Sequence, residues 1–367
     1  MTSTTSHAAR PRLNIDIGPL LEDQWTGISV FTRRLIGALE ASGRLDLSFS
    51  VRMTAIGTAE VHETIRHGSG SFLRAQLDKR DAVERPPLDP ALPLFYPSVK
   101  SHPNIVPREA STIHDMSTLV MPETHDARNV AHHLDPLRNE VSSDEVVFCV
   151  SEATRRALCA TFPWAEGRSR LLMQYVDWPE EFESYDRNLP PVDLGRYAVV
   201  IGTIEPRKNL DLLLRALEHP AVASSRLNFF VIGKRGWLVD QALARLRPEL
   251  ARRVRFTGFV SEFVKYRLLK GAEFLVLPSV YEGFGIPAVE AMSLGKPVLA
   301  SLTSSFPEVI GNAGIFFDPF SVDEFAAALK EMSDARRVAE LTPKAFAQAA
   351  SFSPTRMVAP VLEWLGA

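Results

Sequence analysis

The stretch Tyr281-Glu282-Gly283-Phe284-Gly285-Ile286-Pro287-Ala288-Val289-Glu290 decides the fold of this chain. The apolar run 273–278 before it predicts a buried parallel strand, and the segment 288–292 predicts the start of a helix. In an open α/β sheet, ligands bind beyond the carboxyl ends of the strands, where helix N-termini present free N–H groups to anions. Gly283 and Gly285 let the backbone approach a bound phosphate or sugar. The stretch therefore predicts a ligand-binding crevice.

Two carboxylates, Glu282 and Glu290, stand eight positions apart around this turn. Pro287 suits the first helical position, which places Glu290 within or just beyond the first turn. A glutamate there is stabilised by the helix dipole by about 0.3–1 kcal/mol without any ligand, and Glu282 also fits an ordinary loop carboxylate. Taken alone, the pair leaves a ligand site and two unconnected carboxylates equally open.

A second cluster, Gly202-Thr203-Ile204-Glu205-Pro206-Arg207-Lys208-Asn209, joins a strand predicted over 197–201 to a helix predicted over 210–217. Arginine offers a planar fork for two phosphate oxygens, and lysine offers a compact point charge. Cations at a helix start are disfavoured by the helix dipole when no anion is present. We therefore favour a diphosphate site at Arg207 and Lys208 over a solvated basic pair.

The segment 282–319 resembles the nucleotide-sugar site of the retaining glycosyltransferases of family 4, whose signature is Glu, seven residues, Glu. Glu282 and Glu290 occupy the two signature positions. The elements Ala-Met, Gly-Lys-Pro-Val and Phe-Pro-Glu-Val follow in the family's order. The resemblance implies an α/β protein of the GT-B fold, in which two Rossmann-like, doubly wound domains face each other across a cleft.

The resemblance also implies roles for the site residues. Arg207 and Lys208 would stabilise the departing diphosphate, and Glu290 would hold the ribose hydroxyls. Glu282, with the amides of Phe284 and Gly285, would hold the transferred sugar. The complete set implied for donor binding is Gly27, Thr203, Arg207, Lys208, Gly283, Phe284, Gly285, Ile286 and Glu290. Many relatives carry arginine directly after the glycine, where this chain has Thr203; the guanidinium of Arg207 is the candidate substitute.

The first half of the chain offers fewer candidates. Gly27 ends the loop 18–27 ahead of a predicted helix, and it fits a turn glycine as well as a point where a ligand approaches the backbone. His114 and Asp115 follow the predicted strand 110–113. The family contacts the donor sugar near this position, so we expect a role in catalysis for both, although a lone histidine also fits a structural group.

The length of 367 residues exceeds what one core usually supports and fits two domains of roughly 150–200 residues. We expect an acceptor-binding domain over 1–187 and a nucleotide-sugar domain over 188–350. The resemblance implies that a helix within 351–367 crosses back to the first domain. Between 58 and 107 the pattern weakens, and prolines from Pro86 onward argue against long regular elements.

Short apolar segments separated by helical ones predict parallel, doubly wound sheets. The expected strands are 12–17, 47–53, 110–113, 145–150, 197–201, 228–232, 254–257, 274–277, 297–300 and 315–317. The expected helices include 28–40, a stretch over 124–142 that Pro136 interrupts, and a last helix over 355–365. Ser151 is the expected N-cap of the helix that follows the strand 145–150.

Composition limits the class of protein. Hydrophobic residues make up 46% and charged residues 23% of the chain, as in an ordinary globular enzyme, and a net charge of −3 gives no sign of a nucleic-acid binder. The only cysteines, Cys149 and Cys159, suggest a reducing compartment and no disulfide. No apolar stretch reaches the roughly 18 residues of a membrane span, and the first ten residues lack a signal-peptide core. We therefore expect a cytoplasmic protein.

The sequence contains no Asp-x-Asp pair and no His, Cys or carboxylate set with metal-ligand spacing. The prediction is therefore a metal-independent, cofactor-free hexosyltransferase that retains the anomeric configuration and uses a nucleotide diphosphate sugar. The resemblance to bacterial cell-surface polysaccharide enzymes favours mannosyl transfer from GDP-mannose. The expected acceptor is a saccharide, free or linked to a polyprenyl diphosphate.

Three other interpretations stay open at this point. A nucleotide-sugar epimerase or a glycogen-phosphorylase-like enzyme shares the two-domain shape, and a non-catalytic partner of a transferase would keep the fold. Separately, a basic, aromatic stretch over 155–170 fits either a helix face with its loop or a peripheral contact with anionic lipid at the inner face of the plasma membrane.

Overall fold

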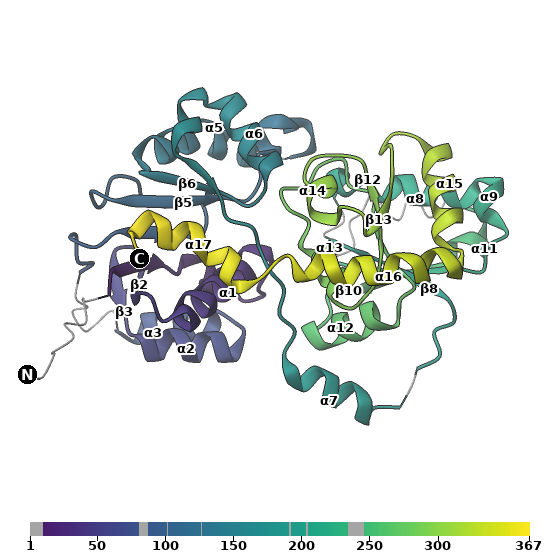
Figure 1. Cartoon of the computed structure of the whole chain (residues 1–367), viewed down its shortest axis with the longest axis horizontal. Helices are drawn as coiled ribbons and strands as arrows, with labels where there is room; N and C mark the ends of the chain where they lie inside the picture. Colours follow the sequence, from purple (N-terminus) through teal and green to yellow (C-terminus); the bar gives the residue numbers. More distant parts are fainter. Residues whose placement is uncertain are drawn as a thin grey trace, which may run out of the picture. The chain divides into compact units, whose positions relative to one another are not determined.

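The computed structural model of the chain describes residues 10–80, 87–100, 102–125, 127–190, 192–202, 205–233 and 246–367 (Figure 1). The chain divides into two units, each with its own parallel sheet. Unit 1 comprises the described residues of 1–120, 127–174 and 353–367, and unit 2 comprises those of 121–126 and 175–352.

Unit 1 is built on a sheet with the strand order β3-β2-β1-β4-β5-β6-β7 among its described residues. All neighbouring strands in it run parallel except β2 and β3, which form an antiparallel pair. Its strands are β1 (Arg12–Asp16), β2 (Asp46–Val51), β3 (Thr54–Ile56), β4 (Leu94–Tyr96), β5 (Glu109–Ile113), β6 (Val146–Cys149) and β7 (Ser169–Leu171). Its helices are η1 (Gly18–Leu21), α1 (Gly27–Ser42), α2 (Thr58–His67), α3 (Ser71–Arg80), α4 (Ser117–Val120), α5 (Ala127–Ser143), α6 (Glu152–Thr161), η3 (Pro163–Arg168) and α17 (Pro354–Leu365).

Unit 2 is built on an all-parallel sheet with the order β10-β9-β8-β11-β12-β13 among its described residues. Its strands are β8 (Tyr197–Ile201), β9 (Asn228–Ile232), β10 (Val254–Gly258), β11 (Leu275–Leu277), β12 (Val298–Ser301) and β13 (Gly314–Phe317). Its helices are η2 (Pro122–Thr124), α7 (Glu180–Asn188), η4 (Pro206–Lys208), α8 (Leu210–Glu218), α9 (Pro220–Ala223), α11 (Pro248–Ala251), α12 (Glu262–Gly271), α13 (Ile286–Ser293), α14 (Phe306–Ile310), α15 (Val322–Met332) and α16 (Ala335–Ala350).

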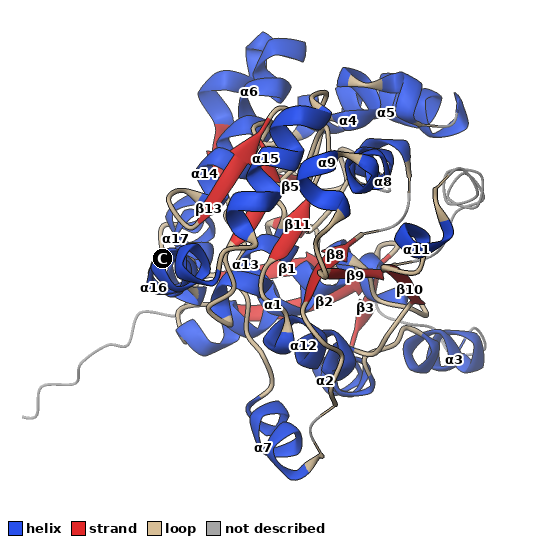
Figure 2. Ribbon diagram, turned by 90° about the vertical axis from the view of Figure 1, so that its right-hand side faces the viewer, coloured by secondary structure: helices blue, strands red, loops and turns tan. Residues whose placement is uncertain are grey.

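Helices cover the sheet of unit 2, as expected for a doubly wound arrangement (Figure 2). The helices α8 and α15 pack together over one part of it, and α13 packs against β11, β12 and α16. The central strands β8, β9, β11 and β12 are buried on both sides, and Phe229, Phe274 and Val276 are fully enclosed in the core. This burial explains why the strands appear in the sequence as short, continuous apolar runs.

The predicted strands are confirmed, but β3, β4 and β7 were not predicted, and β3 pairs with β2 in antiparallel fashion. Two further differences concern helices. Helices α2 and α3 occupy 58–80, where no long element was expected, because the prolines that argued against regular structure begin only at Pro86. The second difference is that α5 continues through Pro136 instead of stopping there. Ser151 caps α6 as predicted, since its hydroxyl accepts a hydrogen bond from the Thr154 N–H at 3.0 Å.

The division between the units falls after residue 174, earlier than the predicted boundary after 187. Helix α7 belongs to unit 2 because it is tied to α12. Tyr266 donates to the Glu183 carboxylate at 2.7 Å, and Arg267 and Lys270 contact Asp186 at 2.8 and 2.9 Å. Sequence composition places a boundary where periodicity fades, whereas these contacts join elements about 80 positions apart.

The C-terminal helix α17 lies in unit 1, where it packs beside α1 (Figure 1). Arg108 donates to the backbone carbonyl of Trp364 at 2.9 Å, and the Trp364 ring meets the Phe148 ring nearly edge-on at 6.3 Å. The chain therefore completes its first unit with its last helix.

Candidate active site of the second unit

Arg207 and Lys208 follow β8 in the short helix η4, directly before α8 begins. Asn209 has a φ of 51°, and its amide donates to the carbonyls of Pro278 at 3.1 Å and Pro319 at 2.8 Å, which anchors the turn. Gly202 is required at the end of β8, because its φ is 150° and a Cβ there would lie 3.3 Å from the Lys208 side chain. The local backbone therefore holds the two cations at the carboxyl edge of the sheet.

Glu282 meets both cations. Its carboxylate accepts hydrogen bonds from Lys208 Nζ at 2.5 Å, from Arg207 at 3.3 Å and from the Ser279 hydroxyl at 2.8 Å. Arg207 also donates to the Tyr281 carbonyl and to the Glu205 carboxylate, both at 2.8 Å. The side chains of Arg207, Lys208 and Glu282 keep 11%, 21% and 12% of their surface exposed. We call these three residues the basic cluster; they are fixed in position yet open to a ligand.

The ionisation of Glu282 follows from these contacts. Burial alone would raise the pKa of this carboxyl, but the charges of Lys208 and Arg207 outweigh burial and hold its pKa below the usual value. The group is therefore ionised at neutral pH and neutralises one of the two cations. Glu205 also contacts Arg207, at 2.8 Å, so two carboxylates face the two cations and an incoming anion would compete with them.

The turn between β11 and α13 is held by serine hydroxyls. The Glu282 N–H donates to Ser304 Oγ at 2.9 Å, and Ser305 Oγ donates to the Glu282 carbonyl at 3.0 Å. Gly285, the N-cap of α13, has a φ of 90°, and a Cβ there would lie 2.8 Å from the Phe306 ring. Glycine is therefore needed at 285 for both its backbone conformation and its close packing.

Glu290, in α13, does not contact the basic cluster. Its carboxylate, with only 3% of the side chain exposed, accepts a hydrogen bond from Lys265 of α12 at 2.6 Å. The Lys265 ammonium lies 5.4 Å from the centre of the Trp178 ring, whose N–H donates to Ser293. The two signature glutamates therefore have separate cationic partners in this structure.

Comparisons with known proteins agree with this geometry. Residues 195–335, which carry the basic cluster and both glutamates, match the family model described as glycosyl transferases group 1. The O-antigen chain mannosyltransferase B of Escherichia coli is 32% identical over 262 residues, or 68% of each chain. The chain belongs to the group 1 glycosyltransferases.

Other relatives of this glycosyltransferase agree with its assignment to the family. The serotype-specific mannosyltransferase WbdA of Escherichia coli is 33% identical over 43% of the chain, although the match spans only 20% of that longer protein. Sucrose-phosphate synthase from Thermosynechococcus elongatus superposes with a TM-score of 0.68 at 17% identity, covering 97% of this chain and 98% of that one. The structural similarity confirms the GT-B fold. The similarity in sequence to known transferases identifies the protein as a transferase.

The predicted site residues of unit 1 have structural contacts in this glycosyltransferase. His114 lies against Phe31, with ring centres 4.7 Å apart, and its Nε2 contacts the Pro97 carbonyl at 2.7 Å. Burial is the main cause that lowers the pKa of His114, which favours the neutral imidazole. Asp115 accepts hydrogen bonds from the N–H and hydroxyl of Ser117 and so caps α4. Their roles in catalysis stay predictions.

The other predicted donor residues are placed as follows. Gly27 is the first residue of α1, and a Cβ there would meet nothing within 4 Å, so packing does not require glycine at this position. Thr203 falls outside the described residues. Phe284 and Ile286 lie in the turn and at the start of α13, beside Gly285.

Some members of the site carried no signal in the sequence. Lys265 lies in an amphipathic stretch with no motif, and only the packing of α12 against α13 brings it to Glu290. Ser279 lies two positions after the end of the predicted strand at Leu277, so its place at the carboxyl edge could have been found. Ser304 belongs to a serine-rich loop whose contact with Glu282 spans 22 positions.

Most arginines of the basic, aromatic stretch 155–170 contact other groups of the protein. Arg155 and Arg156 both contact Glu152, at 2.8 and 3.2 Å. Arg168 lies 4.9 Å from the Trp164 ring centre and also donates to backbone carbonyls at the end of α5. Among the described residues, no helix is long and apolar enough to cross a membrane.

Proposed function

We propose that the protein transfers a mannosyl group from GDP-mannose to a hydroxyl of a saccharide acceptor, with retention of the anomeric configuration. The observation that carries the proposal is the convergence of Arg207, Lys208 and Glu282 at the carboxyl edge of the unit 2 sheet, where α/β proteins bind nucleotides. Mannose is favoured because relatives of the chain are named mannosyltransferases.

The cations of the basic cluster act on the leaving group. As the bond between the sugar C1 and the diphosphate oxygen breaks, negative charge grows on the diphosphate. Arg207 supplies a fork of N–H donors and Lys208 a point charge, and one well-placed donor of this kind is worth about 3–4 kcal/mol. Glu282 acts as a positioning residue, because its contacts hold both cations before the donor arrives.

Retention follows from attack on the same face of the sugar. The acceptor oxygen forms its bond to C1 on the face that the diphosphate leaves, and the acceptor proton passes to the departing phosphate oxygen. The products are GDP and the new glycoside. A time course of the anomeric signals by NMR would test this step, and a trapped covalent glycosyl-enzyme would contradict it.

The identity of the donor is tested by a thermal-shift panel of GDP, UDP, ADP and dTDP sugars. A ligand stabilises the protein in proportion to the logarithm of its concentration over its dissociation constant. We expect GDP-mannose to give the largest rise in Tm. A larger rise with a UDP or dTDP sugar would reject the proposed donor.

We propose that transfer needs no metal, because Arg207 and Lys208 neutralise the diphosphate in its place. No group of three or more His, Cys, Asp or Glu with metal-binding geometry occurs within the described ranges. Turnover is expected to be unchanged in excess EDTA. Loss of activity with the chelator and its recovery with added Mg²⁺ would contradict the proposal.

The remaining parts of the proposal concern the acceptor and the location of the protein. We propose that unit 1 binds the acceptor, a saccharide either free or linked to a polyprenyl diphosphate, in cell-surface polysaccharide synthesis in the cytoplasm. Peripheral contact with the inner membrane surface is tested by sedimentation with anionic liposomes at low salt. None of the relatives reported above favours an epimerase, a phosphorylase or a non-catalytic partner.

A further inference from the structure

Unit 1 contains a cavity of about 770 Å³, within the range of roughly 300–1,000 Å³ typical of ligand pockets. One wall is formed by the end of β1, by η1 and by the start of α1, and a second by the turn after β2. The third wall combines residues 98–100 and Pro103 with one side of α5. The cavity therefore opens beyond the carboxyl ends of β1, β2 and β4, where parallel sheets bind ligands.

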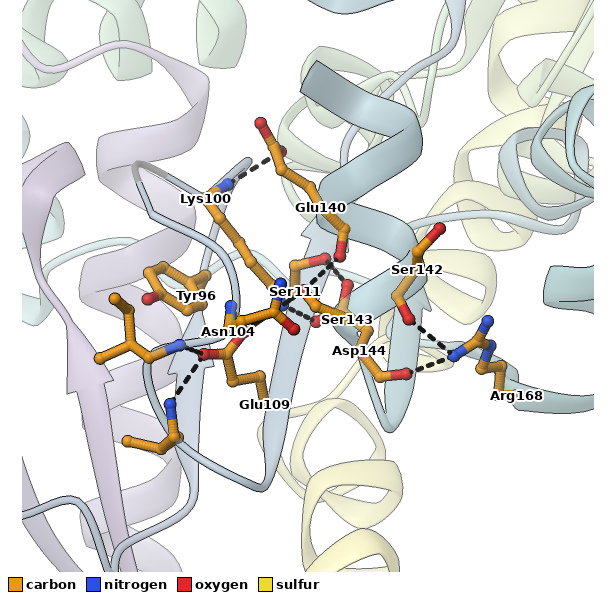
Figure 3. A network of polar contacts seen from close by, with 12 residues as sticks. Tyr96, Lys100, Asn104, Glu109, Ser111, Glu140, Ser142, Ser143, Asp144 and Arg168 are labelled. Carbon is orange, nitrogen blue, oxygen red and sulfur yellow. Dashed lines mark hydrogen bonds and ion pairs between the residues drawn. The ribbon is translucent and has the colours of Figure 1, made fainter. Parts of the chain in front are cut away.

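A buried ionic cluster holds the third wall of the cavity together (Figure 3). The Lys100 ammonium lies 2.6 Å from the carboxylates of Glu109 and Asp144 and 2.7 Å from the Ser143 hydroxyl. The Lys100 backbone N–H donates to Glu140 of α5 at 3.0 Å. The side chains of Lys100, Glu109 and Asp144 are fully buried, so Lys100 is firmly held against the end of α5.

Asp16 is the buried acid that lines the opposite wall. The residue is 9% exposed, and within the described part of the chain its carboxylate receives one hydrogen bond, from the Gly18 N–H to Oδ1 at 2.9 Å. Its Oδ2 has no hydrogen-bond or ion-pair partner there. Burial is the main cause that raises the pKa of Asp16 to about 6. A buried carboxylate with an open oxygen is ready to accept a hydrogen bond from a ligand.

The charges around the cavity disfavour an anionic ligand. Asp16, Glu22 and Glu140 all line it. Lys100 contributes no free ammonium, because that group is fully engaged by Glu109 and Asp144. Arg52 is the cation that remains in the lining, and it is an exposed residue. A phosphate in this cavity would meet more carboxylates than cations, whereas a sugar hydroxyl would meet hydrogen-bond acceptors.

We infer that this cavity binds the neutral, hydroxyl-rich end of the saccharide acceptor, with Asp16 accepting a hydrogen bond from one of its hydroxyls. The inference rests on the proposed function. It adds that the bound end of the acceptor is uncharged, and that Asp16 is the residue that recognises it. Any diphosphate of a lipid-linked acceptor then lies outside the cavity.

Saturation-transfer NMR titrations test the inference, with methyl α-mannoside, methyl α-glucoside and methyl α-galactoside as neutral probes and mannose 6-phosphate as the anionic one. The probes are titrated against the full chain at millimolar concentrations. At least one neutral glycoside is expected to bind the wild type, and D16N is expected to weaken that binding about ten-fold, because a neutral amide oxygen is a weaker acceptor than a carboxylate. Asn139→Phe, an exposed position in the α5 wall, is expected to abolish binding by filling the cavity.

The matched control is Asp46→Asn, an exposed aspartate at the opposite end of β2, which should bind like the wild type. Equal affinities in the wild type and D16N would overturn the inference, as would the absence of binding by every neutral probe. Tighter binding of mannose 6-phosphate that is lost in R52Q would also overturn it, since the cavity would then be a phosphate site.

Failure of the proposed function gives a different result. If no nucleotide sugar raises the Tm while a glycoside still binds through Asp16, the transferase proposal fails and the saccharide site stands. If GDP-mannose binds equally to the wild type and D16N while neither binds a glycoside, only the cavity assignment fails.

Discussion

Each unit pairs a lysine with carboxylate, Lys100 with Glu109 and Asp144 in unit 1 and Lys208 with Glu282 in unit 2, yet the two arrangements differ in their exposure. In unit 1, Lys100 is fully buried between Glu109 and Asp144 and has no route to a ligand. In unit 2, Lys208 and Glu282 keep 21% and 12% of their side-chain surface exposed. A buried ion pair adds little net stability, but removing one of its partners is strongly destabilising. In a partly exposed ion pair, an incoming anion can replace the carboxylate as partner of the cation. Exposure, more than charge, thus separates a structural cluster from a binding one.

Substitution of Lys100 should give the largest difference in stability between the two clusters. K100M leaves Glu109 and Asp144 buried without their cation, so we expect the free energy of unfolding to fall by about 3–5 kcal/mol. Urea unfolding followed by circular dichroism measures the loss. K208M, the same substitution in the partly exposed basic cluster, is the control and should cost less, about 1 kcal/mol, because Arg207 and Ser279 still contact Glu282. Equal losses in the two variants would remove the distinction between the clusters.

Substitution of Lys208 tests whether the basic cluster takes part in the reaction. K208A is expected to lower kcat by about 10²–10³-fold with little change in the KM for the donor, because the ammonium acts on charge that develops in the transition state. Steady-state kinetics with the donor found in the thermal-shift panel measure the effect. K330A, at an exposed lysine of α15, is the control. Unchanged kcat in K208A would exclude the basic cluster from the reaction.

The buried carboxyl of Asp16 should make the stability of the protein depend on pH. Its pKa is raised from 3.8 to about 6, so the folded protein keeps a proton that the unfolded chain releases. The stability from this proton is complete below about pH 3.8 and is lost as the pH rises through 6. D16N should therefore stabilise the protein by about 2 kcal/mol more at about pH 7.5 than at about pH 4.5. Urea unfolding at both pH values tests this, and a pH-independent difference would contradict it; D46N should show none.

Glu290 has features of both clusters, since its side chain is almost as buried as that of Lys100 but lies in the segment that matches the group 1 glycosyltransferases. If it holds the ribose hydroxyls, E290A should raise the donor dissociation constant about ten-fold, the effect of one lost hydrogen bond to a charged group. Isothermal titration calorimetry measures this, with E249Q at an exposed glutamate of α11 as control. Lower stability with unchanged donor affinity would make Glu290 only the partner of Lys265.

The fold and half of the site could be predicted because their signals are local. The strands from 197 to 317 are continuous apolar runs, and their lengths and spacing are sufficient to predict a parallel sheet. Arg207 and Lys208 stand directly after such a strand, so their position at its carboxyl edge follows from chain order alone. From the sequence, Glu282 was assigned to the transferred sugar, and its contacts with both cations, at 2.5–3.3 Å, come from the structure alone.

Other features could not be predicted because they depend on pairs far apart in the chain. Helices α2 and α3 were missed when the prolines beyond residue 86 were given weight over the whole region. The assignment of α7 to unit 2 depends on hydrogen bonds to α12 that no composition change announces. The pairing of Glu290 with Lys265 arises in the same way.

The sequence by itself determined the class of the fold, the order of the strands along the chain and the two motifs of the nucleotide-sugar site, because periodicity and turn chemistry act over a few neighbouring residues. Only the tertiary structure decided which carboxylate meets which cation, and it alone formed the cavity beside Asp16. The physical reason is that the burial and charge balance of a side chain depend on every segment packed around it. Lys100 and α5, for example, meet only when the whole sheet has formed.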